Sequence, residues 1–354
     1  MKHLWKILLV ILCLSIPLAA LAEEGTRVMP EPYASATFTD PSEIPYPENR
    51  DADGYLTEGE FVYENPEQGL WAYLSPTLQV EIVQYDGHWD KMDQRWFVAD
   101  VRFDPAAEHF MSHNWYIEDV TGLDVLGKLQ KNGVTRGDFK DQAIWPKTLA
   151  QCDRMVLAVN VDYYLYRIEH NAGNLIRQGR VLSTVKGAAA FPNLDCAAFY
   201  DDGSMRVFDA TETTAAEQLE KGARDMVSFG PWLVRDGEMR HYTGTYFDHR
   251  EPRLAIGWAE PGHYVIINCE GRVPNGPQGL TLSDLEALLY YNGANEAINM
   301  DGGNTSVLIF MGEKLNRTGN NTKLGSPRNQ NELLGIGTSE LVRTDWVNGD
   351  PKKK

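Results

Sequence analysis

The sequence of 354 residues has few cysteines, a deficit of positive charge and only one long apolar run. Its 4 cysteines are too few and too scattered for the disulfide framework of small secreted proteins. Lysine and arginine number 33 against 50 aspartate and glutamate residues, so the formal net charge is −17. A chain this acidic repels phosphates, and no nucleic acid is expected as a partner. The sequence also has no glycine-rich nucleotide loop and no Cys-x-x-Cys pair, which argues against kinases, dehydrogenases and closed zinc sites.

The single long apolar run lies at the extreme N-terminus. It stops near Ser15 and Pro17, and Ala20-Leu21-Ala22 supplies the small residues that signal peptidase requires. The run is too short to span a bilayer comfortably. We therefore predict a signal peptide over residues 1–22, a secreted, extracellular or cell-envelope location, and no membrane span once the signal peptide is removed.

Composition divides the rest of the chain into three parts. Residues 23–68 are acidic and rich in proline, with little apolar periodicity, and are expected to form a linker. Residues 69–342 carry the apolar patterns of one folded domain, and residues 343–354 form a polar tail.

The patterns within the folded part indicate more strands than helices. Alternating apolar residues over 78–82 and 97–103 predict two half-buried strands joined by a turn at Asp86-Gly87. Capping boxes at Thr214–Glu217 and Thr281–Asp284 each predict a short helix, followed by a glycine and an apolar strand. We therefore expect an α+β (mixed α/β) single domain with a mixed, largely antiparallel β-sheet and a few packed helices.

The most informative segment is the turn that follows the second of these helix–strand units. The apolar stretch Ala297–Met300 leads into Asp301-Gly302-Gly303 and then into Asn304-Thr305-Ser306. Paired glycines let the backbone approach a ligand closely, and a carboxylate fixed there is a candidate general base or metal ligand. The alternative is a tight turn in which Asp301 bonds its own backbone and Asn304 caps the loop.

Taken together, six segments resemble the phosphodiester glycosidase family, in the family's order and from about Trp71 to Gly337. They are Ala158–Tyr164, Gly173–Gly179, Ser228–Pro231, Pro252–Gly257, Glu270–Arg272 and Asp301–Gly303. The resemblance implies a secreted hydrolase that cleaves the glycosidic C1–O–phosphate bond of a sugar-1-phosphodiester. Its substrate and partner would be a carbohydrate phosphodiester of the cell envelope, an exopolysaccharide or the extracellular surroundings.

The resemblance also implies which residues supply the catalytic pocket. The family's motifs place Asp301, Arg253, Asn160 and Asp162 there. Bond cleavage develops positive charge on the sugar ring, so a carboxylate must face the anomeric carbon as a base or as an electrostatic stabiliser. Asp301 is favoured for this role, with Asp162 or Glu270 as its partner.

The phosphate of such a substrate requires a planar guanidinium, which can donate to two oxygens at once. Arg253 is the first candidate, followed by Arg272 and Arg177, and an ordinary ion pair is the alternative for each. Asn160 and Asn304 are candidates for holding sugar hydroxyls or an N-acetyl group. The other candidate substrate-binding residues are Gly230, Gly302, Gly303, Thr305 and Ser306.

The sequence departs from the family pattern at two of these motifs. Val161 follows Asn160 where the family usually has glycine, and Asn304 stands in place of a third glycine. A non-catalytic carbohydrate- or cell-wall-binding protein that retains the pocket is therefore the alternative function. A cysteine hydrolase that uses Cys196 or Cys269 is a weaker rival, because neither thiol has histidine and glycine residues around it in the sequence.

Two further patterns concern metals. Residues 49–60 fit the twelve-position spacing of a calcium loop, with Asp51, Asp53 and Glu60 as candidate ligands. Acidic linkers produce such spacings by chance, which is the alternative to calcium as a cofactor. His109-Phe-Met-Ser-His113 has helical spacing for zinc but lacks the inner glutamate of a zinc protease.

Overall fold

The computed structural model describes residues 27–114, 145–163, 173–184, 194–242, 244, 248–325, 327–328, 330 and 332–344. The predicted signal peptide, residues 1–22, lies outside these ranges, as do residues 345–354 of the predicted tail.

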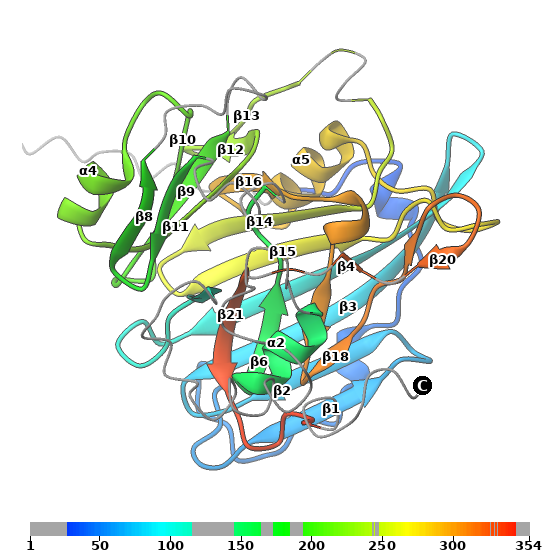
Figure 1. Ribbon diagram of the computed structural model, residues 1–354. Helices are drawn as coiled ribbons and strands as arrows, with labels where there is room; N and C mark the ends of the chain where they lie inside the picture. The colour runs from blue at the N-terminus through cyan, green and yellow to red at the C-terminus, as the bar shows by residue number, and fades with distance from the viewer. Residues whose placement is uncertain are drawn as a thin grey trace, which may run out of the picture.

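Three β-sheets and one two-stranded ribbon organise the described chain (Figure 1). In spatial order, the nine-stranded sheet contains β1 (Phe61–Asn65), β2 (Leu70–Leu74), β3 (Leu78–Trp89), β4 (Met92–Phe103), β15 (His263–Cys269), β14 (Arg253–Glu260), β16 (Glu296–Met300), β12 (Trp232–Arg235) and β13 (Glu238–Met239). One five-stranded sheet contains β10 (Met205–Phe208), β9 (Asp195–Tyr200), β11 (Ala223–Phe229), β7 (Asn174–Arg177) and β8 (Arg180–Thr184). The other contains β18 (Glu313–Lys314), β17 (Leu308–Phe310), β6 (Met155–Val159), β21 (Glu332–Thr338) and β5 (Met111–Asn114), and the ribbon contains β19 (Thr318–Gly319) and β20 (Leu324–Gly325).

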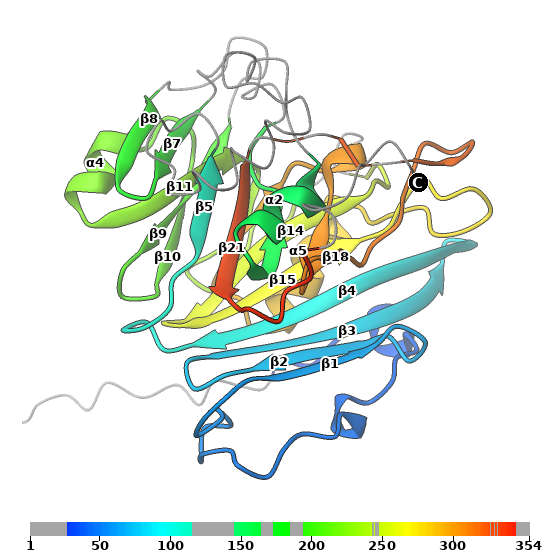
Figure 2. The same cartoon turned by 60° about the horizontal axis from the view of Figure 1, so that its bottom comes forward.

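All pairings between these strands are antiparallel. The β6-containing sheet lies across the long strands β3 and β4 (Figure 2). The main core lies where the three sheets meet, and includes Ile82 of β3, Leu157 of β6 and Val227 of β11. The prediction of a single α+β domain with largely antiparallel sheet is confirmed.

The predicted helices form where their capping boxes begin. Thr214 caps α4 (Ala215–Glu220), and Thr281 caps α5 (Leu282–Tyr291); in both, the side chain three residues later bonds back to the capping residue's backbone. The leucines of α5 face the outer side of the nine-stranded sheet. A third α-helix of the described chain, α2 (Pro146–Cys152), and three 3₁₀ turns, η1 (Tyr33–Ser35), η2 (Pro41–Glu43) and η4 (Gly303–Thr305), complete the elements.

The hairpin formed by β3 and β4 differs from the prediction in the position of its turn. The turn lies at Asp90-Lys91, not at Asp86-Gly87, and both turn residues have positive φ, 53° and 63°. Such angles match the right-handed twist of a two-residue hairpin. Gly87 lies within β3, where a Cβ would collide with the ring of Trp89.

The segment predicted as a linker packs on the folded domain over its described residues, 27–68 (blue in Figure 2). Its last part forms β1, and Thr37 pairs with Asp86 of β3. Ile44 is 3% exposed in a small apolar cluster with Leu70 and Val83. The folded domain therefore begins well before residue 69. Apolar residues too widely spaced to form a period still find burial on the outer face of the sheet.

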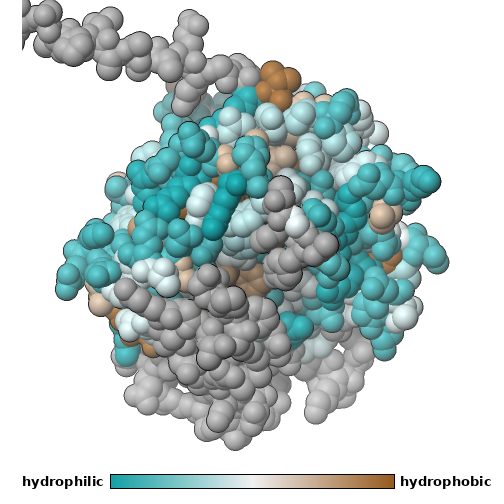
Figure 3. Space-filling view, turned by 90° about the horizontal axis from the view of Figure 1, so that it is seen from above, coloured by the Kyte–Doolittle hydropathy of each residue, from teal (hydrophilic) through white to brown (hydrophobic). Residues whose placement is uncertain are grey.

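The described surface is largely polar. Figure 3 shows a mostly hydrophilic face with isolated apolar residues outside the grey atoms. Exposed large apolar side chains, among them Val28, Phe38 and Leu324, are scattered over the described chain. No helix in the described ranges is both long enough and apolar enough to cross a membrane.

Candidate active site

The glycine turn begins at the end of β16 and joins the nine-stranded sheet to the β6-containing sheet. The Asp301 N–H donates to the Val161 carbonyl at 3.1 Å. At Gly302 a Cβ would lie 2.5 Å from the Pro252 carbonyl oxygen, so only glycine permits this approach of the two strands. Gly303 has φ +60° and donates its N–H to the same carbonyl at 2.9 Å. Both glycines are therefore required by the backbone of the turn.

Buried amide side chains hold this turn in place. Asn160 spans it, because its Nδ2 donates to the Asp301 carbonyl at 2.6 Å while its Oδ1 accepts from Val307 N at 2.9 Å. Asn268 and Asn316 donate to the hydroxyl and the carbonyl of Ser306 at 2.8 and 2.9 Å. Asn160 and Ser306, predicted to contact substrate, are both fully buried and position the turn instead.

Thr305 belongs to the same network of buried contacts. Gln330 donates to its carbonyl at 2.8 Å, and Arg328 donates to its hydroxyl at 2.8 Å. The sequence did not indicate Asn268, Asn316 or Gln330, because a buried amide that serves the backbone carries no motif.

Asp301 and Arg253 lie at neighbouring strand ends, because Leu254 pairs with Met300 in the β14–β16 ladder. Asp301 is 6% exposed and Arg253 is 9% exposed. The Arg253 guanidinium donates to the carbonyls of Leu280 and His249 at 3.3 and 3.0 Å. The two residues are therefore adjacent in the sheet, and the expectation that both contact one substrate stays a prediction.

Arg328 brings a second guanidinium to the turn. Its Nη1 lies 3.9 Å from Asp301 Oδ2. Sequence analysis missed this residue, which lies outside every family-like segment.

A cavity of about 530 Å³ opens beside the turn. His249, Glu251, Arg272 and Gln278 are among its lining residues. Arg272 forms an ion pair with Glu251, and its Nη1 lies 3.4 Å from the position that a Cβ of Gly303 would occupy. Arg272 therefore connects the cavity with the glycine turn, and its contact with a substrate stays a prediction.

Glu270 is placed differently from its predicted catalytic role. It is 1% exposed, and its carboxylate accepts from the backbone N–H of Arg317 at 2.7 Å and from the Arg317 guanidinium at 2.6–3.0 Å. These bonds raise the pKa of Arg317. Nearby, burial lowers the pKa of Lys314 to about 8, and the charge of Glu270 partly offsets this effect. Arg317 and Lys314 are further charged groups that the sequence did not single out.

Asp162 and Arg177 form an ion pair in the interior. Their side chains are 2% and 0% exposed. Asp162 Oδ1 also accepts from Ser228 N at 2.8 Å, and the Arg177 guanidinium donates to the Met226 carbonyl at 2.7 Å. Burial lowers the pKa of Arg177, and the charges of Asp225 and Glu332 counteract this. The pair therefore ties the end of β6 to β7 and β11, and does not face the cavity.

Gly230 also serves the backbone. Its φ is +87°, and it exchanges two hydrogen bonds with Asn299, at 3.0 and 2.7 Å.

The two departures from the family pattern have a structural explanation. The Val161 side chain is fully buried in the main core, so its extra bulk fills the interior and not the cavity. Asn304 lies within η4 and does not have the left-handed backbone that a glycine would favour, whereas Gly303 does. Neither position needs glycine in this chain.

The candidate calcium ligands do not converge. Asp51 Oδ1 accepts from the backbone N–H groups of Asp53 and Tyr55 at 3.0 and 2.9 Å, and Glu60 accepts from the Tyr73 hydroxyl at 2.5 Å. Among the described residues, no group of three or more His, Cys, Asp or Glu side chains could hold a metal ion. The acidic spacing of residues 49–60 forms a turn closed by its own hydrogen bonds, and the calcium interpretation is wrong for this conformation.

The comparisons with known proteins agree with this geometry. The family model for phosphodiester glycosidases matches residues 153–336, more than half of the chain. The chain belongs to the phosphodiester glycosidase family. This matched region contains the glycine turn, Arg253 and all four amides that hold the turn.

Similar proteins extend the match to most of the fold. The catalytic domain of zebrafish N-acetylglucosamine-1-phosphodiester alpha-N-acetylglucosaminidase, auto-inhibited by its pro-peptide, is 18% identical, with a TM-score of 0.54 over 81% of this chain and 90% of that one. A hypothetical protein from Synechocystis is 12% identical, with a TM-score of 0.50 over 75% of this chain and 63% of that one. The SPbeta prophage-derived uncharacterized protein YomE of Bacillus subtilis strain 168 is 33% identical over 172 residues, which are 48% of this chain and 26% of that protein. The chain thus spans about a quarter of this curated relative.

The buried thiols lead to a prediction about the rival cysteine chemistry. Cys196 and Cys269 are free and fully buried, and burial raises the pKa of Cys269 to about 12 and that of Cys196 well above its usual range. We expect neither thiol to react with iodoacetamide at pH 8 in the folded protein, and both to react in guanidinium chloride. Mass spectrometry of the two peptides measures this. Alkylation of either thiol before unfolding would contradict the burial and would support the alternative of a cysteine hydrolase.

The close approach at Gly302 leads to a second prediction. In Gly302→Ala, the new Cβ must push the turn away from Pro252, which should lower the free energy of unfolding by about 1–3 kcal/mol. Because Asp301 would move with the turn, turnover should fall about a hundredfold. Gly325→Ala is the matched control, because its Cβ would meet nothing within 4 Å. Equal behaviour of the two variants in thermal unfolding and turnover would show that the approach is not tight.

Proposed function

We propose that this protein is a secreted hydrolase that cleaves the C1–O–phosphate bond of a sugar-1-phosphodiester in a cell-envelope, exopolysaccharide or other extracellular glycan. The observation that carries the proposal is the place of Asp301, fixed at the family's glycine turn with Arg253 and Arg328 beside it. A carboxylate and guanidinium groups are the two kinds of group that this reaction needs.

The guanidinium groups suit the phosphate half of the substrate. A phosphate monoester is a good leaving group, with a last pKa of about 6, so cleavage depends less on a strong general acid than ordinary glycoside hydrolysis does. Arginine neutralises the developing charge through bidentate hydrogen bonds. Arg272, which lines the cavity, and Arg253, at the turn, are our candidates for this contact.

Asp301 suits the sugar half. We assign it to the anomeric carbon, either as the base that activates water or as the charge that stabilises the oxocarbenium-like transition state. The Asn160 side chain donates to the Asp301 carbonyl, and the Val161 carbonyl accepts from the Asp301 N–H. Both backbone groups of Asp301 are therefore fixed. Preorganisation of this kind makes a charge effective in the transition state.

One observation favours a second candidate function. Asp162 and Glu270 are the two predicted partners of Asp301. Asp162 forms a buried ion pair with Arg177, and Glu270 accepts several hydrogen bonds from Arg317. A site with a single acting carboxylate is compatible with a non-catalytic carbohydrate- or cell-wall-binding protein that keeps the pocket.

Incubation of the purified protein with a panel of sugar-1-phosphodiesters separates the two candidates. A hydrolase should release a free sugar and a phosphate monoester, and ³¹P NMR would detect the monoester. Binding by calorimetry without any release would support the binding protein and overturn the hydrolase. Methyl glycosides of the same sugars are the control, because they lack the phosphate that the arginines are proposed to hold.

Export is tested separately. We expect the mature protein in the medium or the envelope fraction of the native host to begin at Glu23, as Edman sequencing or N-terminal mass spectrometry would show. An intact Met1 on the mature protein would contradict cleavage of residues 1–22.

A further inference from the structure

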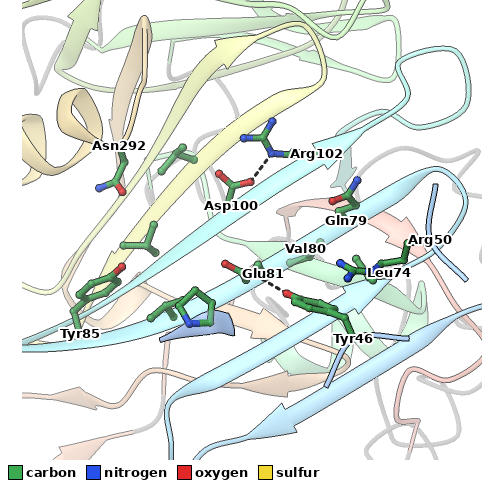
Figure 4. A pocket seen from close by; sticks show the side chains of 14 residues that line it. Tyr46, Arg50, Leu74, Gln79, Val80, Glu81, Tyr85, Asp100, Arg102 and Asn292 are labelled. Carbon is green, nitrogen blue, oxygen red and sulfur yellow. Dashed lines mark hydrogen bonds and ion pairs between the residues drawn. The ribbon is translucent and has the colours of Figure 1, made fainter. Parts of the chain in front are cut away.

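A second hollow lies on the outer face of the nine-stranded sheet, and it shares no lining residue with the cavity beside the glycine turn. Its volume is about 420 Å³, within the range of about 300–1,000 Å³ typical of small-molecule sites. Figure 4 shows that β3 and β4 form its floor, while Tyr46 and Asn292 lie on opposite sides of it. We call this hollow the sheet groove.

The N-terminal segment and α5 build the walls of the sheet groove. Pro41, Tyr46 and Arg50 come from the segment predicted to be a linker, and Asn292 is the residue at the end of α5. The Tyr46 hydroxyl donates to Glu81 at 2.5 Å, which fixes this wall to the floor. One wall of the groove is therefore formed by residues 27–68, folded against the sheet.

The floor carries polar side chains on the solvent-facing side of the sheet. Glu81 of β3 lies directly opposite Asp100 of β4, and Gln79 lies opposite Arg102. Like charges on directly opposed positions destabilise a sheet. The neighbouring Asp100 and, above all, burial raise the pKa of Glu81. Tyr46 donates to Glu81 and Arg102 donates to Asp100, so both carboxylates are held in place along the floor.

The charges of the groove cancel. Arg50 and Arg102 balance Glu81 and Asp100 among the charged lining residues, although the whole chain carries −17. A phosphate or a carboxylate ligand would meet the two acids, and a cationic ligand would meet the two arginines. This balance selects against a charged ligand.

Free hydrogen-bonding groups remain in the groove. Arg102 uses its Nε for Asp100 at 3.1 Å, and Asp100 also contacts His263 Nε2 at 2.8 Å. Within the described chain, neither the terminal nitrogens of Arg102 nor the Tyr85 hydroxyl make a hydrogen bond. Tyr85 is held in place by stacking on Trp96, with ring centroids 5.4 Å apart.

We infer that the sheet groove is a carbohydrate site, separate from the proposed active site, which binds a neutral oligosaccharide. Planar side chains with paired donors or acceptors, as in guanidinium, carboxylate and carboxamide groups, match the adjacent hydroxyls of a sugar ring. Tyr46 and Tyr85, which also line the groove, each offer an apolar ring with a polar hydroxyl at its tip. This inference goes beyond the proposed hydrolysis and does not depend on it.

Binding of uncharged hexasaccharides to the full chain tests the inference. Calorimetry with hexamers of glucose, mannose, galactose and N-acetylglucosamine should show binding of at least one, and a galacturonic acid hexamer should bind more weakly. In the double variant Arg102→Ala/Tyr85→Phe, affinity for the bound hexamer should fall about tenfold or more. Arg154→Ala is the matched control, because Arg154 is also an exposed arginine in an ion pair, 40% exposed against 46% for Arg102.

Two further measurements separate this site from the proposed active site. Asp301→Asn should bind the neutral hexamer as the unchanged protein does, and the double variant should keep full turnover of a small sugar-1-phosphodiester. Tyr85→Phe alone removes one oxygen and keeps the stacking, so it tests the groove even if the double variant does not fold. The inference is overturned if no neutral hexamer binds, if the galacturonic acid hexamer binds more tightly, or if both groove variants bind as well as the control.

Discussion

Asp301→Asn should lower kcat on a sugar-1-phosphodiester about a thousandfold, within the range typical of a lost general base. Asparagine has the shape of aspartate, and the backbone bonds of this residue to Val161 and Asn160 do not involve the side chain. The fold of the turn should therefore survive. What is lost is a negative charge that can take a proton or face the cationic sugar ring, so we expect KM to change far less than kcat.

The control for this experiment is Asp202→Asn. Asp202 is an exposed carboxylate that accepts from the backbone of its own turn, as the alternative interpretation of Asp301 required. Turnover by Asp202→Asn should equal that of the unchanged protein. If Asp301→Asn also retained full turnover, the assignment of Asp301 to the reacting sugar would be wrong. Asp301 would then serve only the structure of the turn.

Arg177→Met should lower the free energy of unfolding by about 3–5 kcal/mol, the cost of leaving a buried charge without its partner. Asp162 would keep its bond to Ser228 but lose its cation. Asp225, which is also fully buried, and the buried Glu332 would lose the same charge. Chemical denaturation measures the change as a shift of the midpoint at constant slope.

A double variant distinguishes an ion pair from simple packing. Asp162→Asn removes the partner charge but keeps an oxygen for Ser228 N, so adding it to Arg177→Met should restore part of the lost stability. Arg154→Met, at an exposed ion pair, should cost less than about 1 kcal/mol. Equal costs for Arg177→Met and Arg154→Met would show that Arg177 is not buried with its partner.

Local patterns predicted the elements whose stability is local. The capping boxes before α4 and α5 begin their helices at the predicted residues, because a cap is satisfied within one turn of chain. The β3–β4 pairing was predicted, but its turn was placed too early. Position 87 needs glycine because a Cβ would collide with the ring of Trp89, and a local turn pattern does not contain this contact. The linker prediction was wrong for a related reason, since Ile44 is buried against Leu70 and Val83, which lie later in the sequence.

The candidate site was predicted unevenly. Resemblance located Asp301, Arg253 and the glycine turn, which the structure brings to neighbouring strand ends. It did not distinguish groups that face a substrate from groups that serve the backbone. Asn160 and Arg177 lie in family-like motifs, but in the structure their buried side chains bond the backbone.

By itself, the sequence predicted the family, the largely antiparallel α+β domain and the glycine turn at which we propose the chemistry. The family came from the resemblance of six segments in order, whereas the strands and the turn follow from apolar periodicity and from glycine's backbone freedom, which act over a few neighbouring residues. Only the tertiary structure decided that Glu270 and Asp162 are paired with Arg317 and Arg177. It also decided that a proline-rich segment walls a groove. Buried ion pairs and cavities join residues from distant parts of the chain, and desolvation determines their energies only once the strands are packed.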